Sequence, residues 1–327
     1  MIDTDADGKA EIVFVDNLGV QSLGWQATGF QSSVRLARRE TVFRAGEFLG
    51  ALTGKFAFEL NGQPRPEFVT PTAGGMAIFE AGENGAFDLL NEIELRSRGA
   101  HSSAYGGLFK RNRRRSYMIE TPEILAADAN LDGRIDLYFV WSDRLNLFLQ
   151  DETGAYPRTP DAQIRLTPVS WDGDCHTIVL DCNGDRRPDV VALRTRGGIA
   201  SAECKVDFYL ADQTGKPSAQ PRKTLTVSQA RTSLILTDIN GDNVPELALP
   251  AVELGTVSTI KMMMQRKGGV YLLVYPLSNG LPGDEATMRK KLDFALDYEA
   301  EAPDQEILFD WSADYNNDGL KDLVYTD

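Results

Sequence analysis

Five short segments of the chain carry acidic and amide side chains at the same spacing. Each reads D-x-[DN]-x-D-x-x-x-[DE] followed by an aliphatic residue, and the five begin at Asp3, Asp128, Asp181, Asp238 and Asp314. Oxygen-bearing side chains at positions 1, 3 and 5 of a tight loop converge on one point, and the acid at position 9 returns from the following strand to close a cage. Such an all-oxygen set suits a hard cation. The predicted metal ligands are Asp3, Asp5, Asp7, Glu11, Asp128, Asn130, Asp132, Asp136, Asp181, Asn183, Asp185, Asp189, Asp238, Asn240, Asp242, Glu246, Asp314, Asn316, Asp318 and Asp322.

Calcium is the cation that this donor set favours. It takes roughly six to eight oxygen ligands, which three or four carboxylates, an Asn and a backbone carbonyl from position 7 would supply. Magnesium keeps waters in its smaller shell, and the loops lack the ligands of soft metals. An EF-hand would need a Glu at position 12, where this chain has Phe14, Phe139, Ala192, Leu249 and Tyr325. Ordinary Asp- and Gly-rich turns could explain one copy, but five copies in frame favour about five calcium sites.

A sixth segment keeps the frame but loses the charge. It has Glu59 at position 1, Asn61 at position 3, Gln63 at position 5 and Glu67 at position 9. Because fewer carboxylates weaken a calcium site, we expect this degenerate loop to be a turn without metal.

The six loops recur every 53 to 76 residues, a period that suits one four-stranded propeller blade. Around Asp181, β-rich runs cover 176–180, 189–193, 205–210 and 223–227, and the loop joins the first run to the second. We therefore predict an all-β chain, with residues 1–327 forming a single β-propeller domain of antiparallel four-stranded blades. About six blades, some of them partial, fall within this chain.

Two stretches exceed this plan. Residues 97–118 include the basic cluster Lys110, Arg111, Arg113, Arg114 and Arg115, expected as an exposed loop that is either solvated or captures an acidic glycan or partner. Residues 253–269 place apolar side chains at helical spacing, which predicts a short helix at the propeller rim.

Composition excludes several classes of function. The chain has a net charge of -14, which argues against nucleic acid as a partner, and no apolar run approaches the roughly 18 residues of a membrane span. The five intact loops hold 16 acidic residues, so the rest of the chain has a net charge of +2.

His101 and His176 are the only histidines, which leaves little material for histidine catalysis. Cys175 and Cys204 could pair across neighbouring strands or remain free buried thiols.

On these motifs the chain resembles the FG-GAP and VCBS repeat family, the integrin-α-like β-propellers with D-x-[ND]-x-D-G-x-x-D-[LIV] loops. The run RKGGVYLLVY from Arg266 is similar to the family's G-x-V-Y-V-Y strand, and the absence of clear FG and GAP tripeptides favours the bacterial VCBS-like branch. The resemblance implies a seven-bladed ring, calcium between the first two strands of a blade, and an extracellular or periplasmic location. Because the chain begins and ends at loops, we expect a fragment of a longer protein whose flanks or partner complete the ring.

The leading functional hypothesis is a non-catalytic calcium-binding propeller that serves as an adhesion-like module for a protein or glycan partner. It would be extracellular, periplasmic or at the cell surface, where millimolar calcium fills weak sites. One alternative is a secreted glycan-active enzyme or lyase using the propeller face, although no catalytic group can be assembled from the sequence. A structural subunit of a surface assembly is the other.

Overall fold

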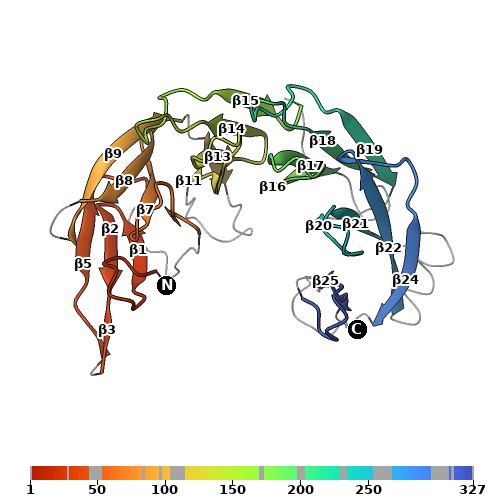
Figure 1. Cartoon of the computed structure of the whole chain (residues 1–327), viewed down its shortest axis with the longest axis horizontal. Helices are drawn as coiled ribbons and strands as arrows, with labels where there is room; N and C mark the ends of the chain where they lie inside the picture. The colour runs from red at the N-terminus through yellow and green to blue at the C-terminus, as the bar shows by residue number, and fades with distance from the viewer. Residues whose placement is uncertain are drawn as a thin grey trace, which may run out of the picture. The chain divides into compact units, whose positions relative to one another are not determined.

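The computed structural model describes residues 2–27, 29–43, 54–82, 85–95, 98–103, 115–168, 173–196, 203–228, 234–252, 267–295, 309–310 and 313–325. Within these ranges every regular element is a β-strand and every strand pairing is antiparallel (Figure 1). The described residues contain no helix that is long and apolar enough to span a membrane. The expectation of an all-β chain is thus confirmed.

The contacts divide the chain into two compact units. The first comprises Met1–Trp141 and Leu145–Gln163, and the second comprises Ser142–Arg144 and Ile164–Asp327. Each unit is built from sheets that are consecutive along the chain.

The first unit begins with a three-stranded sheet, β1-β2-β5, whose ribbon continues into a short hairpin, β3-β4. A four-stranded sheet, β6-β7-β8-β9, and a hairpin, β10-β11, follow. A second four-stranded sheet, β12-β13-β14-β15, comes next, except that residues 144, 164 and 165 of this sheet are assigned to the second unit. The bounds are β1 Ile12–Asp16, β2 Gly19–Leu23, β3 Trp25–Gln26, β4 Gly29–Phe30, β5 Val34–Arg38, β6 Ala57–Phe58, β7 Glu67–Thr72, β8 Gly75–Ala81, β9 Phe87–Glu94, β10 Arg98–Ser103, β11 Arg115–Glu120, β12 Glu123–Ala127, β13 Asp136–Val140, β14 Arg144–Phe148 and β15 Ala162–Arg165.

The second unit repeats the plan. Its first sheet has the order β16-β17-β18-β19, and its second has β20-β21-β22 with β23 and β24 both paired to β22. A two-stranded pair, β25-β26, follows. The bounds are β16 Asp174–Leu180, β17 Asp189–Arg196, β18 Glu203–Tyr209, β19 Lys223–Ser228, β20 Ile235–Thr237, β21 Glu246–Val252, β22 Lys267–Ser278, β23 Leu281–Pro282, β24 Met288–Ala295, β25 Phe309–Asp310 and β26 Val324–Tyr325.

The central strands bury both of their faces, because successive side chains on a strand point to opposite sides of the sheet. In β7, Phe68 packs into a core shared with the β1-β2-β5 sheet, while its neighbour Val69 packs into a core shared with the β12-β15 sheet. In β21, Leu247 faces a core shared with the β16-β19 sheet, whereas Ala248 faces a second core with Leu272 of β22. Each unit is therefore a stack of sheets with apolar layers between them.

Two of the sequence predictions can be compared with the structure only in part. Residues 98–103 and 115–118 of the basic segment are paired strands rather than loop, because β10 and β11 form a regular antiparallel ladder. Residues 104–114, with Lys110 to Arg114, lie outside the described residues, as do residues 253–266 of the expected rim helix. The four-stranded antiparallel sheets are confirmed, while the closed ring, the blade number and the single-domain description stay predictions.

Candidate metal site: the repeated acidic loops

The acidic loops occupy the positions expected of them. Those at Glu59, Asp128, Asp181 and Asp238 connect the first strand of a sheet to the second, and the loop at Asp314 connects β25 to β26. The loop at Asp3 leads into β1 and is closed by a bridge between Ile2 and Glu11.

The five intact loops share one backbone conformation. Position 4 has φ between 60° and 80° and position 6 between 67° and 89° in every copy, although these positions hold both glycine and larger residues. Left-handed φ is costly for residues with a Cβ and persists only where surrounding contacts determine it. The residues concerned are Ala6, Leu131, Gly184, Gly241 and Asn317 at position 4, and Gly8, Gly133, Arg186, Asn243 and Gly319 at position 6.

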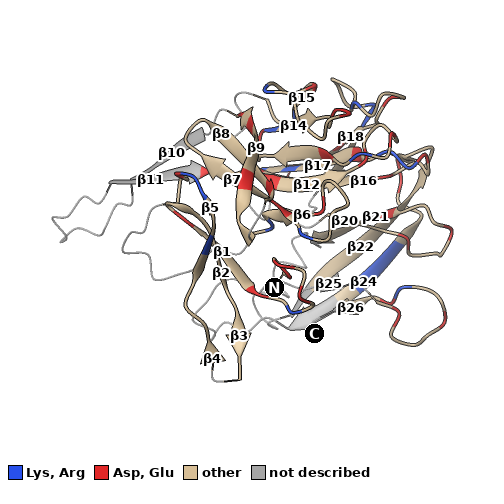
Figure 2. Ribbon diagram, turned by 60° about the vertical axis from the view of Figure 1, so that its left-hand side comes forward, with Lys and Arg blue, Asp and Glu red and all other residues tan. Residues whose placement is uncertain are grey.

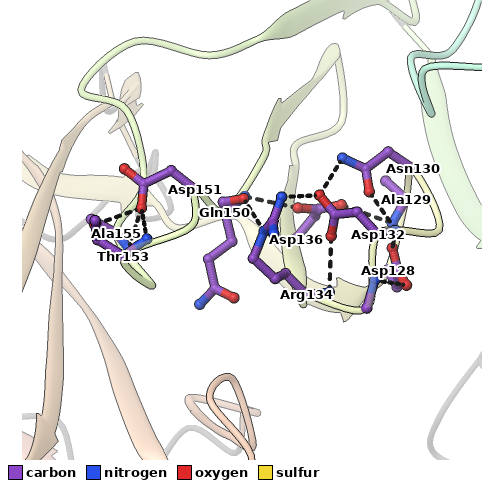
Figure 3. A network of polar contacts seen from close by, with 11 residues as sticks. Asp128, Ala129, Asn130, Asp132, Arg134, Asp136, Gln150, Asp151, Thr153 and Ala155 are labelled. Carbon is purple, nitrogen blue, oxygen red and sulfur yellow. Dashed lines mark hydrogen bonds and ion pairs between the residues drawn. The ribbon is translucent and has the colours of Figure 1, made fainter.

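Backbone amides of the loop itself determine this conformation, as the loop at Asp128 shows (Figure 3). The Asp128 carboxylate accepts hydrogen bonds from the amides of Asp132 at 3.1 Å and Gly133 at 2.8 Å. Asn130 Oδ1 accepts from Asp132 N at 3.0 Å, and Asp132 Oδ1 accepts from Arg134 N at 2.9 Å. Both oxygens of position 1 and one oxygen at each of positions 3 and 5 are thereby fixed on the inner side of the turn.

The acid at position 9 is the most buried member of the motif. Asp136 is fully buried, and its two carboxylate oxygens accept the amides of Ala129 and Gln150, each at 2.8 Å. Burial raises the pKa of Asp136 to about 6, the two amide donors oppose this shift, and the negative charges of Asp132 and Asp128 add to it. The first role of position 9 is thus to tie the loop to the end of the third strand.

The loop at Asp181 repeats this tie. Asp189 is fully buried and accepts the amides of Cys182 at 3.0 Å and Ala211 at 2.7 Å, and burial raises its pKa to about 6. In all six loops, the degenerate one included, the position 9 carboxylate accepts the amide of position 2. These donors are Thr4, Leu60, Ala129, Cys182, Ile239 and Tyr315.

The position 5 carboxylates differ in their neighbours. Asp7 pairs with Lys9 at 3.0 Å and Asp132 with Arg134 at 2.5 Å, in both cases with the basic residue at position 7. Arg187 approaches Asp185 more loosely, at 4.0 Å. The loops at Asp238 and Asp314 have Val244 and Leu320 at position 7, so position 7 supplies no cation there.

The structure brings three carboxylates together in the first loop. Ligand atoms of Asp3, Asp5 and Glu11 lie within 4.8 Å of one another, the one such group of three His, Cys, Asp or Glu side chains in the part of the chain that is described. Asp7 is not part of this group, and its carboxylate bonds to Lys9.

In the other four loops an Asn at position 3 lies between the acids. Its Nδ2 donates to the position 5 carboxylate at 2.9 to 3.3 Å. In the loops at Asp238 and Asp314 it also donates to Glu246 at 2.6 Å and to Asp322 at 3.1 Å. In these two loops the amide group thus bridges carboxylates that the sequence assigns to a cation.

The degenerate loop differs from the intact loops at position 6 and in the contacts of its charged side chains. Position 4, Gly62, keeps the left-handed φ at 70°, but position 6 is Pro64, whose ring fixes φ near -65° and excludes the second left-handed residue of the other five loops. Glu67 is fully buried; its Oε2 accepts Leu60 N at 2.7 Å, and its Oε1 has no hydrogen-bond partner among the described residues. The Arg65 guanidinium bonds to the carbonyl of Thr4 at 2.7 Å and to that of Gly82 at 3.2 Å, and it lies over the Phe87 ring. An arginine therefore links this loop to the loop at Asp3.

The sequence did not predict the hydrogen-bond donors that the position 9 acid finds just after the third strand. Gln150 donates its own amide to Asp136, and its side-chain Nε2 reaches the carbonyl of Leu60 in the degenerate loop at 3.3 Å. A second repeated turn could have revealed this end of the sheet: D-E-T-G follows Gln150 and D-Q-T-G follows Ala211. In both turns the Asp accepts the Thr amide at 2.8 Å, and the glycine has a left-handed φ.

The remaining sequence candidates take no part in the loops' ligand sets. The three cysteines are free, so Cys175 and Cys204 do not pair. Cys175 lies opposite Arg194, and Cys204 lies opposite Thr195. His101 lies on β10 and His176 on β16, in different units.

Comparison with known proteins gives structural likeness only. No protein-family model matches the chain, and no curated protein sequence matches it. A lectin from Agrocybe aegerita, described as recognising non-reducing terminal N-acetylglucosamine, is 13% identical with a TM-score of 0.44, covering 89% of this chain and 78% of the lectin. The Photorhabdus luminescens Tc holotoxin pore is 13% identical with a TM-score of 0.37, covering 99% of this chain and 13% of the toxin chain. The V. cholerae biofilm matrix protein Bap1 is 14% identical with a TM-score of 0.26, covering 90% of this chain and 60% of that protein.

Proposed function

We propose that the protein is a non-catalytic, calcium-binding β-propeller that acts outside the cytoplasm as an interaction module for a protein or glycan. The observation that carries this proposal is the common conformation of the five loops, which holds oxygen atoms of positions 1, 3 and 5 on the inner side of each turn. The family resemblance of the loop motif points the same way.

The residues present fit calcium. Asp3, Asp5 and Glu11 already gather within 4.8 Å, and each carboxylate oxygen that accepts one backbone amide keeps a second lone pair. Asp136 and Asp189 lie buried beside other acids, an arrangement that a divalent cation would stabilise by offsetting like charge. When bound, calcium would supply positive charge and cross-link each loop. Positions 1, 3, 5 and 9 would hold it, with the Asn amide at position 3 giving up its bonds to the acids.

The repetition of the loops favours a scaffold role over chemistry. Each loop lies at its own strand connection, whereas a catalytic metal is held in one site with an open coordination position for substrate. Weak calcium sites of this kind would be filled at millimolar extracellular calcium and empty in the cytosol. The glycan-active enzyme and the structural subunit remain as sequence-based alternatives.

Calorimetric titration of chelator-treated protein tests the proposal. We expect about five calcium ions per chain, no comparable heat from magnesium, and anomalous scattering from the loops in calcium-grown crystals. Loops that hold only water at millimolar calcium would overturn the calcium assignment.

A further inference from the structure

The first sheet ends in a ribbon that carries no charge. None of the 18 residues from Asn17 to Val34 is Asp, Glu, Lys or Arg, in a chain of which 25% is charged. The strands β2 and β3 form one side of this ribbon and β4 and β5 the other, joined by the bond from Gln31 N to Gly24 O at 2.9 Å. Figure 2 shows the β3-β4 hairpin as an extension of the sheet without blue or red segments.

Two aromatic rings stand on this hairpin and face solvent. Trp25 is 63% exposed and Phe30 is 58% exposed, the two being direct cross-strand partners. Their rings meet edge to face with centroids 4.8 Å apart. A cross-strand aromatic pair stabilises a hairpin by a fraction of a kcal/mol up to about 1 kcal/mol. That role explains their contact with each other, but it leaves more than half of each residue exposed to water, and aromatic side chains are enriched at interaction interfaces.

The surroundings of the rings select the chemistry of a ligand. Gln26, Gln31, Ser32 and Ser33 are exposed on the same hairpin and offer amide and hydroxyl groups that both donate and accept hydrogen bonds. An anionic ligand finds no cation among residues 17–34. An uncharged sugar matches both features, since its C–H face packs on an aromatic ring and its hydroxyls bond to amides and hydroxyls.

We propose that the β3-β4 hairpin is a binding site for a neutral carbohydrate, with Trp25 and Phe30 as the stacking surface and the neighbouring Gln and Ser side chains as hydrogen-bonding partners. This inference rests on the proposed interaction function and narrows its partner to an uncharged glycan. The site requires no metal ligand, so it is separate from the acidic loops.

Calorimetry with neutral oligosaccharides at millimolar concentration tests the site, using probes with terminal glucose, galactose, mannose and N-acetylglucosamine. We expect at least one probe to bind the wild-type protein with calcium present. Trp25→Ala should weaken that binding by at least about tenfold, the effect of losing a central aromatic contact. Trp25→Phe, which keeps a ring, should lose less. Leu89→Ala, which removes an exposed apolar side chain of β9 in the same unit, is the matched control and should bind as wild type.

The outcomes separate the two proposals. Binding that survives Trp25→Ala and Phe30→Ala keeps the glycan module and overturns the hairpin site. The absence of binding to every probe overturns the hairpin site and the glycan branch of the proposed function, while calcium counting judges the scaffold independently. A third outcome is that no sugar binds, but the wild-type protein associates with phosphatidylcholine vesicles or with itself. If Trp25→Ala abolishes that association, the rings bind a lipid surface or a second copy instead.

Discussion

At the scale of single residues, the acid at position 9 and the acids at positions 1, 3 and 5 have different roles. Asp189 is fully buried and bonded to two backbone amides, so it is part of the fold whether or not a cation is present. Asp185 is accessible and bonds to the Arg187 amide within the loop, with the Arg187 side chain 4.0 Å away. Its second carboxylate oxygen accepts only the Asn183 side-chain amide, at 3.3 Å, and is therefore the more available metal ligand.

The first prediction compares two position 5 residues. Asp185→Ala should remove one calcium from the titration count and lower the free energy of unfolding in calcium by about 1 to 3 kcal/mol. Gln63→Ala, at the same position of the degenerate loop, should leave both values unchanged because its neutral side chain supplies no charge. An equal calcium count in wild type and Asp185→Ala, or a lost calcium in Gln63→Ala, would contradict the loop-by-loop assignment.

The second prediction concerns Asp16, at the end of β1. Arg35 contacts both of its oxygens at 2.5 and 2.8 Å, and these bonds lower the pKa of Asp16 to about 2. A lowered pKa in the fold adds stability that is present above about pH 4 and is lost as the pH falls toward about 2. Asp16→Asn should therefore be about 1 to 2 kcal/mol less stable than wild type at neutral pH, after allowance for solvent screening.

Urea denaturation at a series of pH values measures this difference, which should shrink steadily on acidification. The exposed pair Arg158 and Glu94 provides the control. Glu94→Gln should cost less than about 1 kcal/mol at every pH, as exposed ion pairs do. A constant difference between Asp16→Asn and wild type down to about pH 2 would show that the loss has another cause.

At the scale of elements, the tight hairpins depend on particular glycines. Gly75 begins β8 with a φ of 153°, and a Cβ there would overlap the backbone carbonyl of Ile93 in β9. The neighbouring Gly74 has open space where its Cβ would be. The two glycines are adjacent in sequence and differ in what surrounds them.

We therefore expect Gly75→Ala to lower the free energy of unfolding by more than about 2 kcal/mol, since backbone would have to move. Gly74→Ala should change it by less than about 0.5 kcal/mol. Thermal melts of the two variants give the comparison, and equal melting temperatures would mean that β8 and β9 adjust freely at this point.

The β24 strand shows how an edge is protected. Among the described strands it pairs only with β22, and Arg289, Lys290 and Lys291 lie along it, visible as the blue segment in Figure 2. Charged side chains on an edge strand oppose pairing with another chain. Arg289 in addition lies 3.9 Å from the centroid of the Tyr271 ring of β22, which fixes the side chain across the pair.

The β-strands were the part of the structure that the sequence predicted best. Around Asp181, the four β-rich runs predicted from hydrophobic and turn residues match β16 to β19, because alternating apolar residues and turn residues act locally. The pairing of Gln150 with Asp136 could not be anticipated, since it joins residues 14 apart through a backbone amide that carries no sequence signal. The bond of Arg65 to Thr4 spans 61 residues and depends on how neighbouring sheets stack. The left-handed φ of Leu131 and Arg186 likewise runs against residue preference.

At the scale of the whole molecule, calcium should act on both units. The loops at Asp3 and Asp128 belong to the first unit, and those at Asp181, Asp238 and Asp314 belong to the second. Each unit builds its cores by stacking sheets, and each places acidic loops at the strand connections of those sheets. Removal of bound calcium would leave clustered carboxylates in both.

The last prediction is that chelation destabilises both units rather than one. A site at a hundredfold excess of calcium over its dissociation constant adds about 2.7 kcal/mol of stability, so the sites of each unit add several kcal/mol together. Hydrogen exchange with and without chelator should show faster exchange in β13 and in β17, one strand from each unit, and the melting temperature should fall. Restoring calcium should reverse both changes and magnesium should not. Faster exchange confined to one unit would show that the loops of the other are turns held by their own hydrogen bonds, and the five-site assignment would then be wrong for that unit.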